Sequence, residues 1–560
     1  MKYAIGLDFG TESARAVLVD LASGADVATA VHDYANGVID ERLPAPNDDV
    51  LLDPDWALQD PDDYLAATRS VVPRVLAETG IDPADVIGVG VDFTSCTILP
   101  TSADGTPLCR LPELRREPHA WAKLWKHHAA QPEADRINAA AAARGEPWLP
   151  RYGGRTSSEW LFAKSLQILD EAPDVYRAAE RVIEAGDWLV WQLAGVETRS
   201  SCAAGYKALW SKADGFPRGE FFAALDPRFA AIIDDKLSRD VQPIGDRAGE
   251  LTAEAAGWTG LRAGTPVAIA NVDAHASVPA VGVTEPGTLV AVMGTSTCHM
   301  ALGSTLALAE GVAGVVEDGI IPGFFGYEAG QAAVGDLFAW FSRYAVPPDL
   351  HDRARREGTS VHAVLEREAA ALRPGGSGLL ALDWWNGNRS VLVDAELSGL
   401  LVGMTLATRP AEIYRALLEA TVFGTRVVID SLAAAGVPVD RIVACGGLPE
   451  RNPLLMQLTA DITGREVDVA ASHQASALGA AMLGAVAAGA DAGGFASISE
   501  AAAAMVQPHA RSYRPDPATR RDYDELFADY LALHDEFGRG DNDVMRRLRA
   551  RRARPATGMA

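Results

Sequence analysis

The chain opens with two short runs of hydrophobic residues that are separated by a polar turn. Residues 3–7 are apolar, residues 14–19 are apolar except for Arg15, and residues 8–13 (DFGTES) lie between the two runs. Two such runs around a turn that contains glycine are typical of a β-hairpin. We therefore predict that the chain begins with a hairpin whose tip is exposed.

A helix and a buried strand follow the hairpin. Residues 60–79 have a helical pattern that begins after a capping aspartate and ends at Gly80, and residues 86–91 form an uninterrupted hydrophobic run that ends at Asp92. Capped periodic segments predict helices, whereas short continuous hydrophobic runs predict buried strands. Strand, helix and strand in this order indicate an α/β domain.

The same theme returns in the second half of the chain. Residues 288–293 and 298–302 are hydrophobic and flank the turn GTST at residues 294–297, while residues 410–435 form a long helical pattern and residues 441–445 a buried strand. We interpret this recurrence as a degenerate internal duplication. It predicts an amino-terminal domain over residues 1–285, a carboxyl-terminal domain over 286–545, and a flexible basic tail over 546–560.

Length and composition favour a globular protein of at least two domains. The chain has 560 residues, of which 48% are hydrophobic and 22% charged, and chains of this length divide into more than one core. The net charge of −25 repels phosphate backbones and anionic lipids, so we expect neither nucleic acid nor membrane as a partner. The amino terminus lacks the pattern of a signal peptide, which favours a cytoplasmic location. A homodimer is one arrangement that the sequence leaves open.

The two turns are the strongest candidates for a phosphate-binding site. Each offers backbone N–H groups and hydroxyls at a hairpin tip, and such a tip can surround a phosphate group. A single tip of this kind is more often structural, but two equivalent tips could hold a polyphosphate from both sides. Asp8 precedes the first tip, where its carboxylate could orient hydrated Mg²⁺ or simply cap the turn. The chain contains no Gly-Lys dipeptide and therefore no Walker A loop.

A second candidate carboxylate, Asp273, follows the hydrophobic run at residues 267–270. Sites in α/β domains form at the carboxyl ends of strands, and an aspartate there can accept the proton of a hydroxyl that attacks a phosphoryl group. It could equally cap a helix that begins at Ala274. The local sequence leaves these two roles open.

A glycine-rich turn follows the strand at residues 441–445. Gly446 and Gly447 lead to Asn452, which is suited to cap a helix that begins at Pro453. A bare backbone turn can lie against a nucleobase or a ribose, but a Gly-Gly pair is more often a tight connection between a strand and a helix.

Taken together, the chain resembles the FGGY family of carbohydrate kinases over nearly its whole length, and within it the members that act on L-ribulose. The stretches that carry this resemblance are GVDFTSCTILP (90–100), LWKHHAAQPEADRIN (124–138), GGRTSSEW (153–160), AGYKALW (204–210), NVDAHAS (271–277) and LDWWNGNRS (382–390). The resemblance implies an α/β fold of two actin-like, ribonuclease H-like domains on either side of a cleft for ATP and sugar. It also implies phosphorylation of L-ribulose to L-ribulose 5-phosphate in L-arabinose catabolism, with ATP and Mg²⁺.

The resemblance also implies roles for individual residues. Asp273 would be the catalytic base, and Asp8 would lie near the metal. The implied ATP-binding residues are Thr11, Ser13, Arg15, Gly294, Thr295, Gly335, Gly446, Gly447 and Asn452. The implied sugar-binding residues are Thr94, Ser95, Cys96, Lys207, Asp273 and Glu328. Without the resemblance, Lys207 and Glu328 would be interpreted as ordinary charges that face solvent. Another pentulose or a pentitol such as ribitol is the alternative substrate, and an actin-like ATPase without a sugar substrate is the alternative function.

Overall fold

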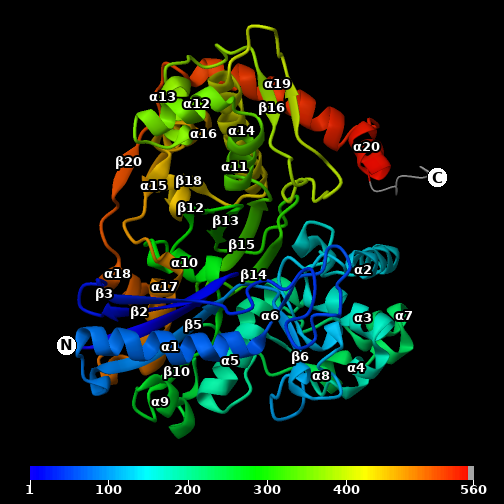
Figure 1. Ribbon diagram of the computed structural model, residues 1–560, viewed down its shortest axis with the longest axis vertical. Coiled ribbons are helices and arrows are strands. Elements are labelled where there is room, and N and C mark those ends of the chain that lie inside the picture. Colours follow the sequence, from blue (N-terminus) through cyan, green and yellow to red (C-terminus); the bar gives the residue numbers. More distant parts are fainter. Residues whose placement is uncertain (553–560) are drawn as a thin grey trace.

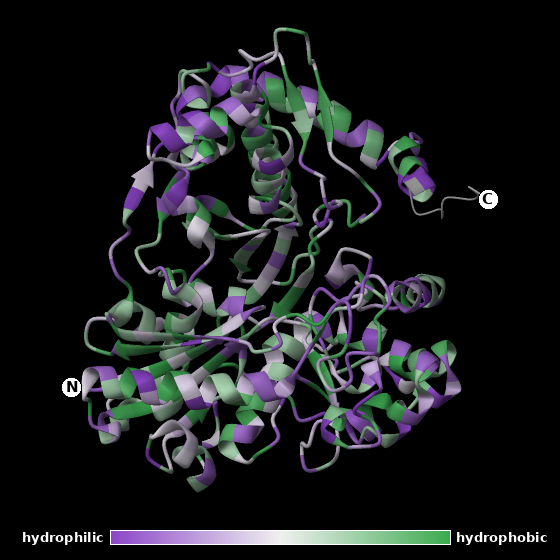
Figure 2. Cartoon of the chain, viewed as in Figure 1, coloured by the Kyte–Doolittle hydropathy of each residue, from purple (hydrophilic) through white to green (hydrophobic). Residues whose placement is uncertain are grey.

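The computed structural model describes residues 1–552 and contains two α/β halves, each built around a mixed β-sheet (Figure 1). The amino terminus lies in the lower half of Figure 1, and most of the elements after residue 286 lie in the upper half. Figure 2 shows that hydrophobic residues concentrate in the strands and inner helices, whereas hydrophilic residues lie on the outer helices. Burial of apolar surface between sheets and helices thus organises both halves.

The first sheet has seven strands in the order β3-β2-β1-β5-β10-β9, with β11 also paired to β5. Strands β1 and β2 are antiparallel, and β1 runs parallel to β5. The strands are β1 (Tyr3–Phe9), β2 (Ser13–Asp20), β3 (Asp26–Asp33), β5 (Val86–Phe93), β9 (Arg247–Glu250), β10 (Pro266–Ala268) and β11 (Asn271–Val272). The predicted hairpin and the predicted buried strand are both confirmed.

Helices cover both faces of the first sheet, and one of them comes from the far end of the sequence. Helices α1 (Pro61–Thr79), α5 (Ala185–Ala194) and α9 (Ala253–Thr259) lie on one face, and α17 (Ala475–Ala488) packs on β1 and β5. Helix α17 consists mainly of alanine and approaches very closely, since a Cβ atom on Gly6 would lie 1.8 Å from the Ala477 carbonyl oxygen. Small residues on both sides therefore set this spacing.

The second sheet repeats the plan of the first, in the order β14-β15-β13-β12-β18-β19-β20. Its strands are β12 (Gly287–Met293), β13 (Thr297–Gly303), β14 (Gly314–Glu317), β15 (Phe325–Gln331), β18 (Val439–Cys445), β19 (Glu466–Val469) and β20 (Arg511–Tyr513). Its main helices are α11 (Gly335–Tyr344), α13 (Val361–Ala370), α14 (Pro410–Ala434), α16 (Pro453–Thr463) and α19 (Arg520–Gly538). The hairpin, the long helix and the buried strand predicted for this half are all present.

Smaller elements complete both halves. A four-stranded sheet in the lower half contains β4 (Leu58–Gln59), β6 (Ile98–Thr101), β7 (Ala122–Lys123) and β8 (Arg181–Glu184), and the upper half adds the pair β16 (Leu380–Leu382) and β17 (Leu400–Val402). The remaining helices are α2 (Gln131–Arg144), α3 (Leu161–Glu171), α4 (Pro173–Ala178), α6 (Ser201–Lys207), α7 (Gly219–Leu225), α8 (Ile232–Lys236), α10 (Asp273–Ala280), α12 (Pro348–Arg356), α15 (Gly447–Arg451), α18 (Ile498–Met505) and α20 (Val544–Arg552).

The structure refines several predicted boundaries. Strand β5 continues to Phe93, so Asp92 lies within the strand rather than after it. The predicted strand before Asp273 is divided into β10 and β11. The domain division at 285/286 stays a prediction, and α17 packs on the first sheet although it lies far beyond that division. Helix α20 covers the first part of the predicted basic tail, and residues 553–560 lie outside the described residues.

Candidate functional site

The first turn connects β1 to β2 and is held by neighbouring segments. The Gly10 backbone N–H donates a hydrogen bond to the Ser13 carbonyl oxygen at 3.0 Å. The Trp125 indole Nε1–H donates to the Thr11 hydroxyl at 3.0 Å, and Gln59 Nε2 donates to the Thr11 carbonyl oxygen at 2.7 Å. The turn is therefore positioned before any ligand binds, and its remaining N–H groups can donate hydrogen bonds to a phosphate.

Charged residues surround the base of this turn. Arg15 lies opposite Asp8 in the hairpin, with its Nε 3.2 Å from Asp8 Oδ2, and its Nη1 donates to Gln474 Oε1 at 2.9 Å. Burial raises the pKa of Asp8, although the Arg15 guanidinium opposes this shift. Asp92 lies beside Asp8 on the neighbouring strand β5. The sequence signal for Asp92 was its place at the end of a hydrophobic run, but it was not assigned a role.

The second turn lies against two of the predicted ATP-binding glycines. The Gly335 backbone N–H donates to the Gly294 carbonyl oxygen at 3.1 Å, and the Asp336 N–H donates to the Thr295 carbonyl oxygen at 3.2 Å. A Cβ atom on Gly335 would lie 2.5 Å from that Gly294 oxygen, and one on Gly446 would lie 2.5 Å from the Met293 carbonyl oxygen. The fold thus brings Gly446 against Met293, 153 positions earlier in the sequence, and only glycine allows this approach.

Asn452 is placed differently from the backbone turn that precedes it. Gly447 begins the short helix α15, and Asn452 then caps α16, as the sequence predicted: its Oδ1 accepts a hydrogen bond from the Leu455 N–H at 2.9 Å. Its Nδ2 donates to the Tyr414 hydroxyl at 3.2 Å, and its side chain is buried. Both ends of the amide are therefore occupied, and its contact with ATP stays a prediction.

Asp273 is the first residue of α10 and follows β11 directly, next to the end of β5. Its Oδ1 accepts a hydrogen bond from the Ala274 N–H at 2.6 Å. The helix already includes Asp273 and its N-cap residue is Val272, so the predicted alternative, a cap on a helix that begins at Ala274, is wrong. Burial, followed by the negative charge of Asp8, raises the pKa of Asp273 to about 7. A carboxylate with a pKa near neutrality is suited to accept a proton from a substrate.

Lys207 and Glu328 form a buried ion pair between the two halves of the molecule. Lys207 ends α6 and Glu328 lies in β15, and the Lys207 ammonium donates to both carboxylate oxygens at 2.8 and 2.9 Å. Burial works to raise the pKa of Glu328, but the Lys207 charge lowers it below its usual range. Lys207 is 4% and Glu328 9% exposed, so the interpretation as charges that face solvent is wrong. A buried pair of opposite charges can bind polar groups of a ligand.

Two residues that the sequence reasoning missed extend this pair. The His275 imidazole Nε2 lies 3.2 Å from Glu328 Oε2, and its Nδ1 lies 3.0 Å from Cys202 Sγ. Burial lowers the pKa of His275, although Glu328 opposes this shift, and a neutral ring follows. Because His275 lies only two positions after Asp273, the NVDAHAS stretch contained a signal for it.

The predicted sugar-binding segment Thr94–Cys96 follows β5 and has an unusual backbone. Cys96 has a φ angle of 63°, which is uncommon for a residue other than glycine. The buried Lys164 ammonium donates to the Cys96 carbonyl oxygen at 2.6 Å and to the Leu124 carbonyl oxygen at 2.7 Å, which stabilises this conformation. The segment also lines a small hollow beside Asn271.

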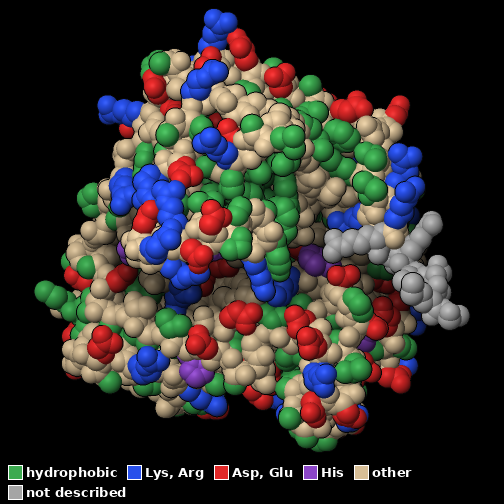
Figure 3. Space-filling view, turned by 45° about the horizontal axis from the view of Figure 1, so that its top comes forward, with side chains coloured by type: hydrophobic (Ala, Val, Ile, Leu, Met, Phe, Trp, Pro, Cys, Tyr) green, Lys and Arg blue, Asp and Glu red, His purple; other side chains and the backbone are tan. Residues whose placement is uncertain are grey.

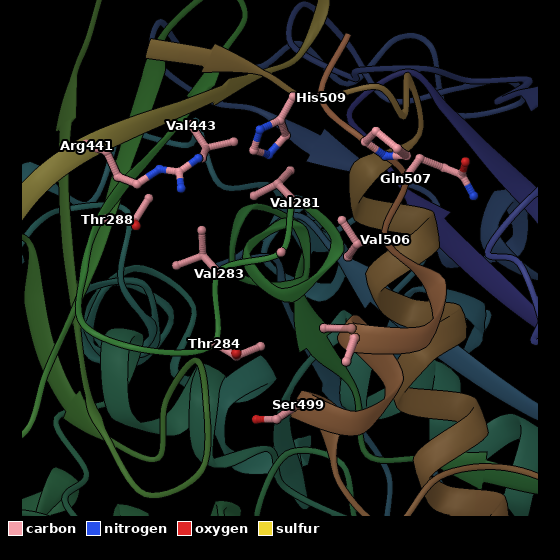
Figure 4. A pocket seen from close by; sticks show the side chains of 14 residues that line it. Val281, Val283, Thr284, Thr288, Arg441, Val443, Ser499, Val506, Gln507 and His509 are labelled. Atoms are coloured by element: carbon pink, nitrogen blue, oxygen red, sulfur yellow. The ribbon is translucent and has the colours of Figure 1, made fainter. Parts of the chain in front are cut away.

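Figure 3 shows a recess between the two halves that is bordered by both basic and acidic side chains. A larger hollow, of about 540 Å³, lies elsewhere, between the segments at 281–284 and 506–509 that connect the halves (Figure 4). Its walls combine apolar side chains such as Val281 and Val443 with polar ones such as Arg441 and His509, and none of the predicted site residues lines it. Within residues 1–552, no helix combines the length and the hydropathy needed to cross a bilayer.

Comparisons with known proteins match this arrangement over both halves. Residues 3–279 match the amino-terminal domain, and residues 289–488 the carboxyl-terminal domain, of the FGGY family of carbohydrate kinases. The chain is 58% identical to a ribulokinase of Geobacillus thermodenitrificans over 548 residues, which cover 98% of this chain and 97% of the relative. A ribulokinase of Mycolicibacterium smegmatis is 50% identical over 553 residues, or 99% of this chain and 97% of the relative.

The fold also resembles solved structures. The crystal structure of xylulose kinase from Rhodospirillum rubrum aligns with a TM-score of 0.76 and 25% identity, covering 95% of this chain and 98% of that chain. The predicted fold class, two actin-like α/β domains, is confirmed by this likeness and by the two sheets.

Proposed function

Because the chain belongs to the FGGY family of carbohydrate kinases, we propose that it transfers the γ-phosphoryl group of MgATP to the terminal hydroxyl of L-ribulose. The product would be L-ribulose 5-phosphate, as expected in L-arabinose catabolism in the cytoplasm. The observation that carries this proposal is the buried Lys207–Glu328 pair between the two halves. An actin-like ATPase without a sugar substrate has no evident use for such a pair.

The pair is suited to an open-chain ketopentose. Such a sugar presents a carbonyl and several hydroxyls, and the Lys207 ammonium can donate a hydrogen bond to them while Glu328 accepts one. The backbone of residues 94–96 would complete the sugar site. A sugar that lacks one of these partners leaves a buried charge unsatisfied, at a cost of about 1 to 3 kcal/mol.

Asp273 would act as the catalytic base. Its carboxylate accepts the proton of the terminal hydroxyl as the phosphoryl group arrives, and its pKa of about 7 leaves it substantially ionised at neutral pH. The backbone N–H groups and hydroxyls of the two turns would hold the phosphates in line with that hydroxyl. Positioning of this kind accounts for much of the catalysis of phosphoryl transfer.

The residues at the base of the first turn fit a magnesium ion. Asp8 supplies a hard oxygen ligand beside the proposed phosphate turn, and the neighbouring carboxylate of Asp92 has no hydrogen-bond partner within the described residues. Mg²⁺ bound there would neutralise charge that develops on the phosphate oxygens.

A substrate panel tests the proposal. ADP release coupled to a spectroscopic reporter is measured with L-ribulose, D-ribulose, D-xylulose, ribitol and glycerol. We expect L-ribulose to give the highest kcat/KM and D-xylulose and glycerol to be at least about tenfold poorer. If ribitol or D-ribulose is preferred, the kinase assignment survives with the alternative substrate. ATP hydrolysis that does not depend on any sugar would contradict the proposal as a whole.

A further inference from the structure

We propose that Asp92 is a second carboxylate ligand of the divalent metal ion that accompanies ATP, beside Asp8. This inference rests on the proposed function, since it assumes that metal and nucleotide phosphates meet at the first turn.

The first observation is the isolation of the Asp92 carboxylate. Asp92 is 0% exposed, and neither Oδ1 nor Oδ2 has a hydrogen-bond donor among residues 1–552. The neighbouring side chain is the Asp8 carboxyl, with which Asp92 can form a hydrogen bond only when one of the two groups is protonated. Of the charges that act on it, Asp8 and Asp273 are also negative, and the cation Arg15 already pairs with Asp8. A buried carboxylate without a donor is strongly unfavourable unless a cation compensates it.

The second observation is the position of Asp92 relative to Asp8. The two residues are direct partners in the parallel pairing of β1 and β5, so their side chains project from the same face of the sheet. Asp8 lies two residues before Gly10, where the first phosphate turn begins, and Asp92 lies next to Asp8 at the paired position of β5. Mg²⁺ commonly takes one or two carboxylates together with substrate phosphates, and this pair supplies two carboxylates next to a phosphate turn.

The internal duplication shows that the sheet itself does not require these carboxylates. In the second half, β12 and β18 pair in the same parallel manner. Val292 lies two positions before Gly294, as Asp8 does before Gly10, and its partner on β18 is Cys445. These neutral residues occupy the places that correspond to Asp8 and Asp92. Packing therefore allows an uncharged residue at this register, and Asp92 calls for another explanation.

Another buried carboxylate of the same molecule shows how a structural aspartate is accommodated. Asp383 is also buried, but its oxygens accept hydrogen bonds from Gln331 Nε2 at 2.8 Å and from the Tyr530 hydroxyl at 3.0 Å. Asp92 lacks such donors. The contrast favours a ligand-binding role for Asp92 and makes Asp383 a matched control.

The test measures metal binding directly. Mn²⁺ replaces Mg²⁺, and electron paramagnetic resonance follows its binding to the full-length protein in the presence of a non-hydrolysable ATP analogue. We expect Asp92→Asn to weaken Mn²⁺ binding at least about tenfold, a loss typical of residues that support a metal site, and Asp383→Asn to leave it unchanged. Asp92→Ser should behave like Asp92→Asn, and it serves if the asparagine variant does not fold.

Two further measurements separate the possible outcomes. If Asp8→Asn weakens Mn²⁺ binding but neither Asp92 variant does, this inference is overturned while the proposed metal site survives; Asp92 then shares a proton with Asp8 for structural reasons. If Asp8→Asn also has no effect, the metal site itself is misplaced and the inference fails with it. The melting temperature without ligand should rise in Asp92→Asn, because the repulsion between the adjacent carboxyl groups of Asp92 and Asp8 is relieved, and should fall in Asp383→Asn, which loses an acceptor of two hydrogen bonds. A fall in Asp92→Asn would count against the inference.

Discussion

The two hairpin turns have the same construction but different chemistry. In each half, a strand leads into a glycine-containing turn and pairs in parallel with a buried strand from later in that half. In the first half the paired positions before the turn are Asp8 and Asp92, whereas in the second half they are Val292 and Cys445. The fold thus provides a backbone site for phosphate twice and a carboxylate site only once.

The second turn is instead fixed by close packing. Gly335 and Gly446 bring backbone atoms of other segments against it, and no acidic side chain occupies the paired positions beneath it. The comparison indicates that duplicated elements can take different roles. We assign metal binding and proton transfer to charged residues of the first half, and binding of the nucleotide by uncharged backbone groups to the second half. The Lys207–Glu328 pair joins the two halves. Five predictions are based on this division.

The largest effect is expected for the base. Asp273→Asn keeps the size of the side chain but cannot accept a proton, and we expect kcat to fall by about 10² to 10⁴. The dissociation constants of sugar and ATP, measured by calorimetry, should change little. Turnover close to that of the unmodified protein would remove Asp273 from this role.

A smaller but still large effect is expected for the pair that joins the halves. Lys207→Met and Glu328→Gln should each lower kcat/KM for the sugar by about 10², because each leaves a buried partner unsatisfied. The KM for ATP should stay within about twofold, since neither side chain is assigned to the nucleotide. Equal losses for sugar and ATP would indicate that the pair maintains domain structure instead. A double variant whose loss is smaller than the sum of the single losses would show coupling.

A substitution beside the second turn should affect the use of ATP rather than the use of the sugar. A Cβ atom on Gly335 would lie 2.5 Å from the Gly294 carbonyl oxygen, so Gly335→Ala should displace the turn and raise the KM for ATP by about tenfold. The KM for the sugar should be nearly unchanged. Gly257→Ala is the control, because no neighbouring atom lies within 4 Å of its added Cβ. If Gly335→Ala affects the sugar and not ATP, the division of roles between the turns is wrong.

The smallest effect is the pH dependence of the base. Burial and Asp8 raise the pKa of Asp273 from 3.8 to about 7, with Glu328 and Lys207 acting on it in opposite directions. We therefore expect kcat/KM to be half-maximal near that pH and to fall as the pH decreases, since protonated Asp273 cannot act as a base. An acidic limb that stays near pH 4 would show that the base is a different carboxyl group.

The same shift has a defined sign for stability. Between pH 3.8 and about 7, the folded state binds a proton at Asp273 that the unfolded state has released. The contribution of this group to the free energy of unfolding therefore decreases as the pH rises through that window. Urea unfolding at several pH values should show a weaker decrease in Asp273→Asn than in the unmodified protein.

The sequence by itself determined the elements of this protein. Apolar runs on either side of a polar turn predicted the hairpin β1–β2 and its repeat β12–β13, and a helical pattern predicted α14. Such patterns are visible in the sequence because residues that face the core recur at the short repeat of a strand or a helix. The quoted stretches of the family resemblance contain Asp273 and Lys207, and the resemblance as a whole also implied Glu328 as a site residue. It could not give the geometry of the Lys207–Glu328 pair, whose members are 121 positions apart.

Tertiary structure decided the environment of each side chain. In the folded chain α17 packs on the first sheet, and the Trp125 indole donates a hydrogen bond to Thr11. His275 lies beside Glu328, and Asp92 has no hydrogen-bond donor among residues 1–552. None of these follows from local pattern, since burial and partners depend on segments that meet only when the chain folds. The periodicity of a sequence reports which face of an element is buried, but the energy of a buried charge depends on which other charges and donors lie within a few ångströms of it.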